Sequence, residues 1–252
     1  MDIYSQQRFL IHLRDRFGIA PDYEKILQEH YLRFLKAGDV VFDIGGNEGV
    51  HATKLAEIVG AQGVLHVFEP IPDLAAALQE RFARQSHVTV HNVALSNFHG
   101  QSEFVLAKGV LSESGLKERK FSNPAMVEPT RIQVQVERLD DFTRDTDRLD
   151  YIKMDIEGGE LDCLSAAVDT LGRLRPVMSV EYGAEAYAAY GHRRGDLWDL
   201  CQRNRYALFD IIGNRIPDAE VWDRVCDRVY WDYLCVPSEK LEWFVSRIGP
   251  GP

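Results

Sequence analysis

The chain has 252 residues, of which 45% are hydrophobic and 27% charged, and its formal net charge is −10. These are ordinary globular values, and the length allows one large domain or a domain with an appendage. The acidic balance argues against a nucleic-acid partner or an anionic membrane surface, both of which would require a basic face.

No apolar run approaches the ~20 residues that a membrane-spanning helix needs. The first residues show neither a basic start nor an apolar core, so we expect no signal peptide and a cytoplasmic protein. The cysteines are scattered and form no Cys-x-x-Cys pair, which favours buried, reduced thiols over a zinc or redox site. They are Cys163, Cys201, Cys226 and Cys235.

The first part of the chain predicts two helices that precede a sheet. Aromatic and aliphatic residues recur three to four positions apart over about residues 5–36, with Pro21 between two such stretches. We therefore expect an N-terminal helical extension over residues 1–37. Two roles remain open for it: the helices cover one face of the core, or they form part of a lid over the active site.

From Val40 onward, strand and helix patterns alternate, which predicts an α/β domain over residues 38–252 with a mostly parallel sheet and helices on both faces. Parallel strands are expected at about 40–44, 64–68, 88–93, 151–155 and 177–181, with helices at about 49–59, 72–84, 159–171 and 195–204. Alternating polarity predicts half-exposed strands at about 101–106 and 131–136, and two closing strands at about 206–211 and 229–236.

The segment at about 107–130 has no clear periodicity and is rich in serine and proline. A loop of this length inside a compact domain is usually functional or disordered. Two interpretations stay open: a mobile flap near a cofactor, or a disordered insertion.

A glycine-rich turn follows the first strand. Gly45, Gly46 and Gly49 let the backbone turn sharply and approach a ligand closely. Glu69 ends the next strand. A glycine turn after one strand and a carboxylate at the end of the next predict a nucleoside site, with the carboxylate on the ribose hydroxyls.

The residues of the turn also indicate which nucleoside binds. The dinucleotide fingerprint requires glycine where this chain has Asn47 and Val50, which disfavours an NAD-dependent oxidoreductase. Asp43 and Glu48 place negative charge at the turn, and this charge would repel phosphates. An acidic turn suits a nucleoside whose tail carries a sulfonium and an ammonium group, which describes S-adenosylmethionine.

Polar residues end five of the predicted strands. Ligands bind at the carboxyl ends of strands in such a sheet, so these residues are candidates for one site. A carboxylate in an apolar setting is costly unless it is paired or functional. The five residues are Asp43, Glu69, Asn92, Asp155 and Glu181.

Asp155 is the strongest candidate for chemistry. It leaves its strand on the same side as Lys153 and Glu157. Asp155 is predicted to be the base for an acceptor hydroxyl, or a ligand that holds a divalent cation such as Mg²⁺ together with Glu157 and Glu181. Simple ion pairing is the alternative. Glu160 falls in the first turn of the next helix, where we predict that it stabilises the positive end of the helix dipole.

His192 lies in the loop after the fifth strand, on the ligand side of the sheet. It is either a second candidate to accept a proton near neutral pH or a solvated loop histidine. The neighbouring Arg193 and Arg194 either attract an anionic acceptor or belong to a solvated basic loop.

Several motifs in the same order resemble the FkbM family of S-adenosylmethionine-dependent methyltransferases. The run from Phe42 to Gly49 resembles its first cofactor motif, and Val67 to Pro70 resembles its second. Further segments resemble the family at 92–96 followed by Gly100, at 138–142, at 152–160 and at 176–181. The resemblance covers about residues 38–182.

The resemblance implies a Rossmann-like class I methyltransferase fold of seven strands with the last one antiparallel. By this likeness Asp43, Gly45, Asn47 and Gly49 frame the methionine moiety, and Glu69 holds the ribose beside Pro70. Asn92, Ala94 and Leu95 would lie near the adenine. Gly46 stands where the family often has alanine, a conservative departure.

The resemblance also implies methyl transfer to a hydroxyl oxygen, often in a natural product or sugar, which makes a small hydroxylated molecule the expected partner of a monomer or homo-oligomer. Asp155, Glu181 and His192 are the expected catalytic residues. The alternatives are a binding module on the same fold that has lost its chemistry and an NAD-dependent oxidoreductase.

Overall fold

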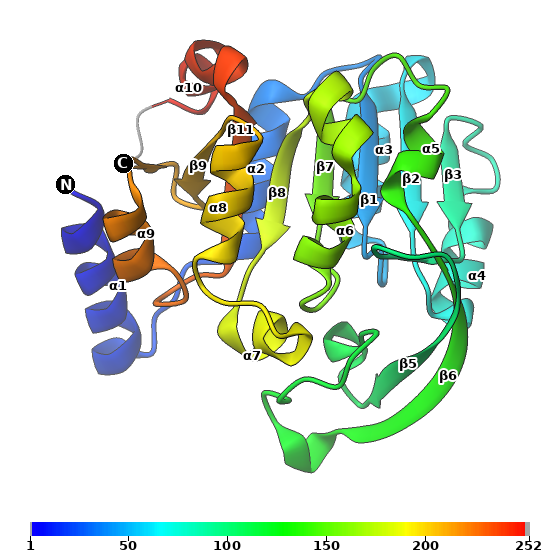
Figure 1. Ribbon diagram of the computed structural model, residues 1–252, viewed down its shortest axis with the longest axis horizontal. Coiled ribbons are helices and arrows are strands. Elements are labelled where there is room, and N and C mark those ends of the chain that lie inside the picture. The colour runs from blue at the N-terminus through cyan, green and yellow to red at the C-terminus, as the bar shows by residue number, and fades with distance from the viewer. Residues whose placement is uncertain (1, 250–252) are drawn as a thin grey trace.

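The computed structural model describes residues 2–249, which form a central sheet with helices on both faces (Figure 1). The sheet has eight strands in the order β10-β9-β11-β8-β7-β1-β2-β3. Their bounds are β1 Val40–Ile44, β2 Val64–Phe68, β3 Val88–His91, β7 Tyr151–Met154, β8 Val177–Glu181, β9 Tyr206–Asp210, β10 Arg215–Ile216 and β11 Asp232–Pro237.

The directions of the strands match the predicted, mostly parallel sheet. Strands β3, β2, β1, β7 and β8 pair in parallel, and β11 lies antiparallel between β8 and β9. The expected seven strands are present, and the two-residue β10 adds an eighth at the edge. The chain order reverses between β1 and β7, and such a switch point opens a crevice at the carboxyl ends of the strands.

The helices pack their apolar sides on this sheet. In Figure 1, α6 and α8 lie in front of the sheet and α2 and α3 behind it. Helix α3 buries Ala52, Leu55, Ala56 and Val59, the three-to-four spacing of an amphipathic helix. The bounds are α1 Ile3–Phe17, α2 Tyr23–Phe34, α3 Val50–Val59, α4 Pro72–Phe82, α5 Leu139–Thr143, α6 Glu160–Ala166, α7 Ala184–Tyr187, α8 Asp196–Arg203, α9 Ala219–Val225 and α10 Leu241–Ile248.

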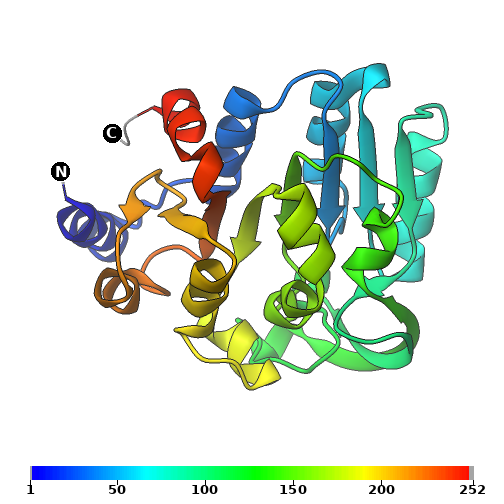
Figure 2. The same cartoon turned by 45° about the horizontal axis from the view of Figure 1, so that its top comes forward.

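The N-terminal helices are fastened to the domain. Helix α2 places Leu27 and Tyr31 in the main core, where they are 2% and 0% exposed. Helix α1 lies beside α9 in both views (Figure 1, Figure 2). There the side-chain amide of Gln7 donates to the Val225 carbonyl at 3.0 Å and to the Tyr230 hydroxyl at 2.9 Å. These contacts fit the core-covering role, and a role as a lid stays a prediction.

A second, three-stranded sheet lies beyond the carboxyl ends of the main strands, in the order β4-β6-β5. Its strands are β4 Ala94–Leu95, β5 Gly100–Lys108 and β6 Glu128–Glu137. The predicted loop at 107–130 is therefore too long, because β5 and β6 continue as a hairpin that pairs Lys108 with Glu128. The connection folds back, and Val105 bridges Gly115.

The predicted helix at about 159–171 is interrupted at Ala167, and residues 168–174 are helical again. Helix α6 ends at Ala166, whose carbonyl accepts from the Arg138 guanidinium at 2.8 Å. A new turn then starts at Thr170, because the Asp140 carboxylate accepts from the Thr170 backbone amide at 2.9 Å and from its hydroxyl at 2.7 Å. A side chain distant in sequence thus competes with continuation of the helix.

Two composition-based expectations can be compared with the structure. All four cysteines are free and buried, as predicted. Among residues 2–249, no helix combines the length and the apolar character required to cross a bilayer.

Two local contacts fix the edge of the sheet at the switch point. Gly45 has a φ of +86°, and a Cβ atom there would lie 1.8 Å from the backbone oxygen of Asp155. Glu160, 1% exposed at the start of α6, accepts from the backbone amides of Ile156 at 2.9 Å and Gly158 at 3.2 Å. Glu160 therefore shapes the loop between β7 and α6, besides its predicted position at the helix N-terminus. Burial raises the pKa of Glu160 to about 7, although both amides oppose the shift.

The first prediction concerns the close approach at Gly45. Gly45→Ala should destabilise the protein by roughly 3 kcal/mol or more, because it adds a backbone clash to the ~1–2 kcal/mol cost of a left-handed residue. Gly191→Ala is the matched control: Gly191 has a φ of +81° and nothing within 4 Å of its added Cβ. Urea unfolding measures both, and equal losses would contradict a specific role for the Gly45 contact.

The second prediction concerns Glu160 and pH. A buried acid with a raised pKa is protonated in the folded state, so its contribution to stability is greatest below about pH 4.5 and falls as pH rises through about 7. Glu160→Gln keeps an acceptor for both amides and removes this loss. The free energy of unfolding of the variant, relative to that of the wild type, should be ~1–3 kcal/mol higher at pH 8 than at pH 5.

Urea unfolding at both pH values measures this difference. Glu242→Gln is the control, because Glu242 is an exposed glutamate in the first turn of α10 that solvent hydrates in both states. Parallel pH curves for Glu160→Gln and the wild type would refute a buried, protonated Glu160.

Candidate functional site

An open cavity of about 660 Å³ lies at the carboxyl ends of β1, β2 and β7. The main sheet forms its floor, and the β5–β6 hairpin with its connection forms the opposite wall. Its lining residues are Ile44, Gly45, Asn47, Phe68, Glu69, Pro70, Ile71, Val93, Ala94, Leu95, Phe104, Leu111, Ser112, Ser114, Leu116, Asp155, Ile156, Glu157, Gly159 and Tyr190.

The glycine turn contributes two residues to this lining, Gly45 and Asn47. The backbone amides of Gly45 and Gly46 both donate to the Phe68 carbonyl at 3.0 Å, which ties the turn to β2. Gly46 and Gly49 do not line the cavity. A Cβ atom on either would lie 2.4 Å from Val67 or Leu78, so these glycines permit close packing of the turn rather than ligand contact.

Glu69 is the central polar group of the cavity. Its carboxylate accepts from the backbone amides of Asn47 at 2.7 Å and Ile71 at 2.8 Å, and it is 3% exposed. Burial raises its pKa, and the two amides oppose this shift. Because a carboxylate can accept more than two hydrogen bonds, Glu69 retains capacity for ligand hydroxyls.

The predicted adenine-side residues divide into two groups. Ala94 and Leu95 line the cavity beside Pro70. Asn92 does not, and its side-chain amide instead donates to the carbonyls of Glu69 at 2.9 Å and Pro70 at 3.0 Å. Asn92 therefore holds the loop that carries Glu69.

The apolar wall of the cavity was largely missed by the sequence analysis. Ile71, Ala94 and Phe104 belong to a small core cluster that joins the hairpin to the main domain. Leu111 and Leu116 extend this wall from the connection between β5 and β6. Such a surface suits a flat, weakly polar base. The predicted flap thus lies against the cavity, while its mobility stays a prediction.

Asp43 lies beneath the cavity and does not line it. The side chain is fully buried, and neither carboxylate oxygen has a hydrogen-bond partner among the described residues. Asp43 is paired in register with Lys153 on β7. Burial raises the pKa of Asp43, and the Lys153 ammonium opposes that shift. Asp43 therefore supports the turn from below, and its predicted role in framing the methionine moiety stays a prediction.

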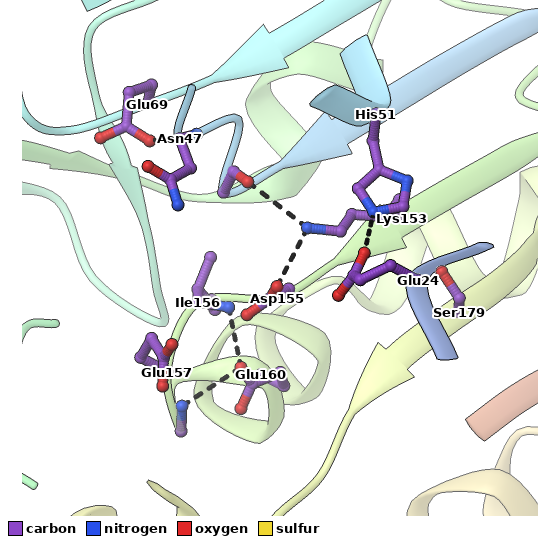
Figure 3. A network of polar contacts seen from close by, with 12 residues as sticks. Glu24, Asn47, His51, Glu69, Lys153, Asp155, Ile156, Glu157, Glu160 and Ser179 are labelled. Carbon is purple, nitrogen blue, oxygen red and sulfur yellow. Dashed lines mark hydrogen bonds and ion pairs between the residues drawn. The ribbon is translucent and has the colours of Figure 1, made fainter. Parts of the chain in front are cut away.

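Asp155 and Lys153 form a charged centre at the edge of the cavity (Figure 3), and the Glu181 carboxylate lies close to that of Asp155. The Lys153 ammonium lies 3.1 Å from an Asp155 carboxylate oxygen. Desolvation raises the pKa of Asp155, but the Lys153 ammonium holds it below its usual value. Burial and the adjacent Asp155 charge raise the pKa of Glu181 well above its usual value. The two shifts run in opposite directions because two neighbouring carboxylates repel each other when both are ionised.

The predicted metal ligands are close together but not free. Asp155, Glu157 and Glu181 each offer an oxygen within 4.8 Å of the others. However, Glu157 forms an ion pair with Arg119 from the connection between β5 and β6. A cation would have to displace that guanidinium. The geometry is that of ion pairing, and a metal site stays a prediction.

His192 is not brought to this centre. Its Nε2 lies 3.1 Å from a carboxylate oxygen of Asp162 on α6, and it does not line the cavity. Arg193 pairs with Asp196 at 3.1 Å, and Arg194 lies 3.5 Å from Asp227. The predicted roles of this loop in proton transfer or anion binding gain no support from its placement.

The sequence analysis missed three titratable residues near the centre: Glu24, His51 and Asp232. His51 on α3 is 7% exposed and lies 2.5 Å from a Glu24 carboxylate oxygen (Figure 3). It also lies 3.2 Å from the Tyr31 hydroxyl. Asp232 on β11 is paired in register with Glu181, and burial and Asp155 raise its pKa to about 7. A histidine inside a helix and acids on distant elements carry no local sequence signal for such a meeting.

The chain is similar to several known methyltransferases. The model of the methyltransferase FkbM domain matches residues 43–207. The 2-O-methyltransferase NoeI of Sinorhizobium fredii is 26% identical over 167 residues, which cover 60% of this chain and 67% of NoeI. A protein-L-isoaspartate O-methyltransferase of Methanococcus aeolicus is 31% identical over 108 residues, or 40% of this chain and 50% of that protein.

Among solved structures, a methyltransferase FkbM from Methylobacillus flagellatus aligns with a TM-score of 0.48 and 19% identity. That alignment covers 93% of this chain and 60% of the other, so the chain spans less than two thirds of that relative's length. The family match covers well over half of the 252 residues. The chain therefore belongs to the FkbM family of S-adenosylmethionine-dependent methyltransferases.

Proposed function

We propose that this protein transfers the methyl group of S-adenosylmethionine to a hydroxyl oxygen of a small molecule, a sugar or a natural product. The observation that carries the proposal is the Asp155 carboxylate at the edge of the cavity, next to the Gly45 turn and 3.1 Å from the Lys153 ammonium. The name of NoeI, a 2-O-methyltransferase, supports oxygen as the acceptor atom.

The cavity fits the cofactor in three respects. Glu69 offers a fixed carboxylate for ribose hydroxyls, and the apolar wall at Ile71 and Phe104 offers a surface for adenine. The turn at Gly45 and Asn47 lies next to the negative charge of Asp155, as a cationic sulfonium and ammonium require. When bound, the cofactor supplies an electrophilic methyl group.

The chain then has two tasks, to place the acceptor oxygen in line and to accept its proton. An alcohol is a weak nucleophile and loses its proton as the carbon–oxygen bond forms, so a nearby carboxylate assists. Asp155 is the ionised carboxylate at the cavity edge, with a side chain 33% exposed. Orientation of the oxygen against the methyl group supplies most of the acceleration.

Two alternatives make different predictions. A binding module without chemistry would bind the cofactor product but transfer no methyl group. An NAD-dependent oxidoreductase would bind NAD, although the turn lacks the dinucleotide fingerprint and carries acids. Calorimetry with S-adenosylhomocysteine and NAD, followed by screening of hydroxylated sugars and polyketides with and without Mg²⁺, separates the three functions and tests the metal.

The third prediction concerns Glu69. Wild-type protein should bind S-adenosylhomocysteine with micromolar affinity and not bind NAD. Glu69→Gln should weaken S-adenosylhomocysteine binding by ~10–100-fold, because it removes the charge that strengthens hydrogen bonds from hydroxyls and disturbs the amide of Asn47. Glu48→Gln is the matched control, since Glu48 is exposed on the same turn and does not line the cavity. Equal effects of the two variants would refute a direct role for Glu69.

The fourth prediction separates Asp155 from His192. Asp155→Asn should lower methyl transfer by ~10²–10⁴-fold, the usual contribution of a positioned base, while S-adenosylhomocysteine still binds. His192→Ala should keep most activity, because that side chain contacts Asp162 outside the cavity. Turnover with the acceptor found in the screen measures both. Full activity of Asp155→Asn would remove Asp155 from the mechanism.

A further inference from the structure

Lys153 is a buried lysine directly behind the edge of the cavity. It lies on β7, and its side chain is 6% exposed. Burying an ammonium group is costly unless opposite charges or hydrogen bonds compensate it. Its neighbours in register are Asp43 on β1 and Ser179 on β8. A cation between the two strands that flank β7, directly behind the cavity edge, calls for an explanation beyond core packing.

The ammonium group makes two contacts with different parts of the site. Its Nζ donates to Asp155 Oδ2 at 3.1 Å and to the Gly45 carbonyl at a longer 3.5 Å (Figure 3). Gly45 belongs to the turn that lines the cofactor cavity, and Asp155 stands at the edge where the acceptor oxygen has to arrive. One cation therefore touches both the turn on the donor side and the carboxylate on the acceptor side.

The side chains of Lys153 and Asp155 differ in exposure, and this difference indicates which of them faces the cavity. Lys153 is buried behind Asp155, whose side chain is 33% exposed toward the cavity. Holding Oδ2 from behind fixes the carboxylate plane and leaves the rest of the group open to a ligand. Without this contact, repulsion from the neighbouring acids would favour rotation of the Asp155 carboxylate away from Gly45. The further titratable groups around the pair are Glu24, Asp43, His51, Glu160, Glu181 and Asp232.

We propose that Lys153 is a positioning residue for methyl transfer: its ammonium group holds the Asp155 carboxylate oriented relative to the cofactor turn. The inference rests on the proposed function, because it assigns a role in that reaction. Lys153 does not line the cavity, so it acts through Asp155 and Gly45 rather than on the reactants.

The test compares Lys153→Met and Lys153→Arg with the wild type. Methionine keeps the length of the side chain and removes the charge, whereas arginine keeps the charge. Lys153→Met should lower kcat at least 100-fold and change the KM of the acceptor and the Kd of S-adenosylhomocysteine less than threefold. The kcat of Lys153→Arg should be at least tenfold higher than that of Lys153→Met.

Lys240→Met is the matched control for loss of a half-buried lysine. Its Nζ donates to the Arg175 carbonyl at 2.5 Å, away from the cavity. This variant should lose stability without a change in kcat. If Lys153→Met does not fold, as judged by circular dichroism, Lys153→Arg decides: activity as low as that of Asp155→Asn would overturn the inference.

The remaining outcomes also discriminate. A Lys153→Met variant with kcat within threefold of the wild type would overturn the positioning role and leave the proposed function intact. A loss that appears equally in KM, Kd and kcat would assign Lys153 a merely structural role. No methyl transfer by the wild type to any acceptor, despite S-adenosylhomocysteine binding, would overturn the proposed function and this inference together.

Discussion

The contact between the Gly45 turn and the end of β7 is the constraint on which the site depends. The backbone at Asp155 approaches Gly45 so closely that no side chain fits between them. The contact lies where the strand order of the sheet reverses, so two parts of the chain more than a hundred residues apart share one edge. Once they are joined, the cofactor turn and the carboxylate of Asp155 are fixed relative to each other without a ligand.

The electrostatics of the centre follow from this crowding. Five carboxylates gather around two basic groups at one end of the sheet, and burial makes it costly for all of them to be ionised. The pKa values of these carboxylates consequently diverge: that of Asp155 is lowered, and those of Glu181 and Asp232 are raised. The carboxylates are those of Glu24, Asp43, Asp155, Glu181 and Asp232, and the basic groups are Lys153 and His51.

Sequence patterns predicted the strands and helices whose formation depends on neighbouring residues in the chain. The strands at 40–44, 64–68 and 177–181 appear at the predicted residues, because each is a short apolar run bounded by turn residues. Short helices such as α7 and α9 and the two-residue β10 were missed, since so few residues show no periodicity. The break after α6 was unpredictable for another reason: the Asp140 carboxylate that starts the next turn comes from a separate helix.

The sequence likewise predicted only those features of the candidate site that depend on position along a strand. Glu69 and Asp155 were identified because they end strands, and ends of parallel strands meet at one edge. Position along the chain could not separate residues that line the cavity from residues that support it, as Asp43 and Asn92 do. His192 lies on the predicted side of the sheet, yet its side chain turns to Asp162. The apolar wall at Phe104 depends on how the hairpin folds over the sheet, which no local pattern encodes.

The connection between β5 and β6 ties the apolar wall of the cavity to the rest of the domain. Arg119 pairs with Glu157, and the Lys117 ammonium lies 4.8 Å from the centre of the Tyr190 ring. The same connection carries Leu111 and Leu116, which line the cavity. The shape of the surface proposed for adenine therefore depends on Arg119 and Lys117, two cations that do not line the cavity themselves.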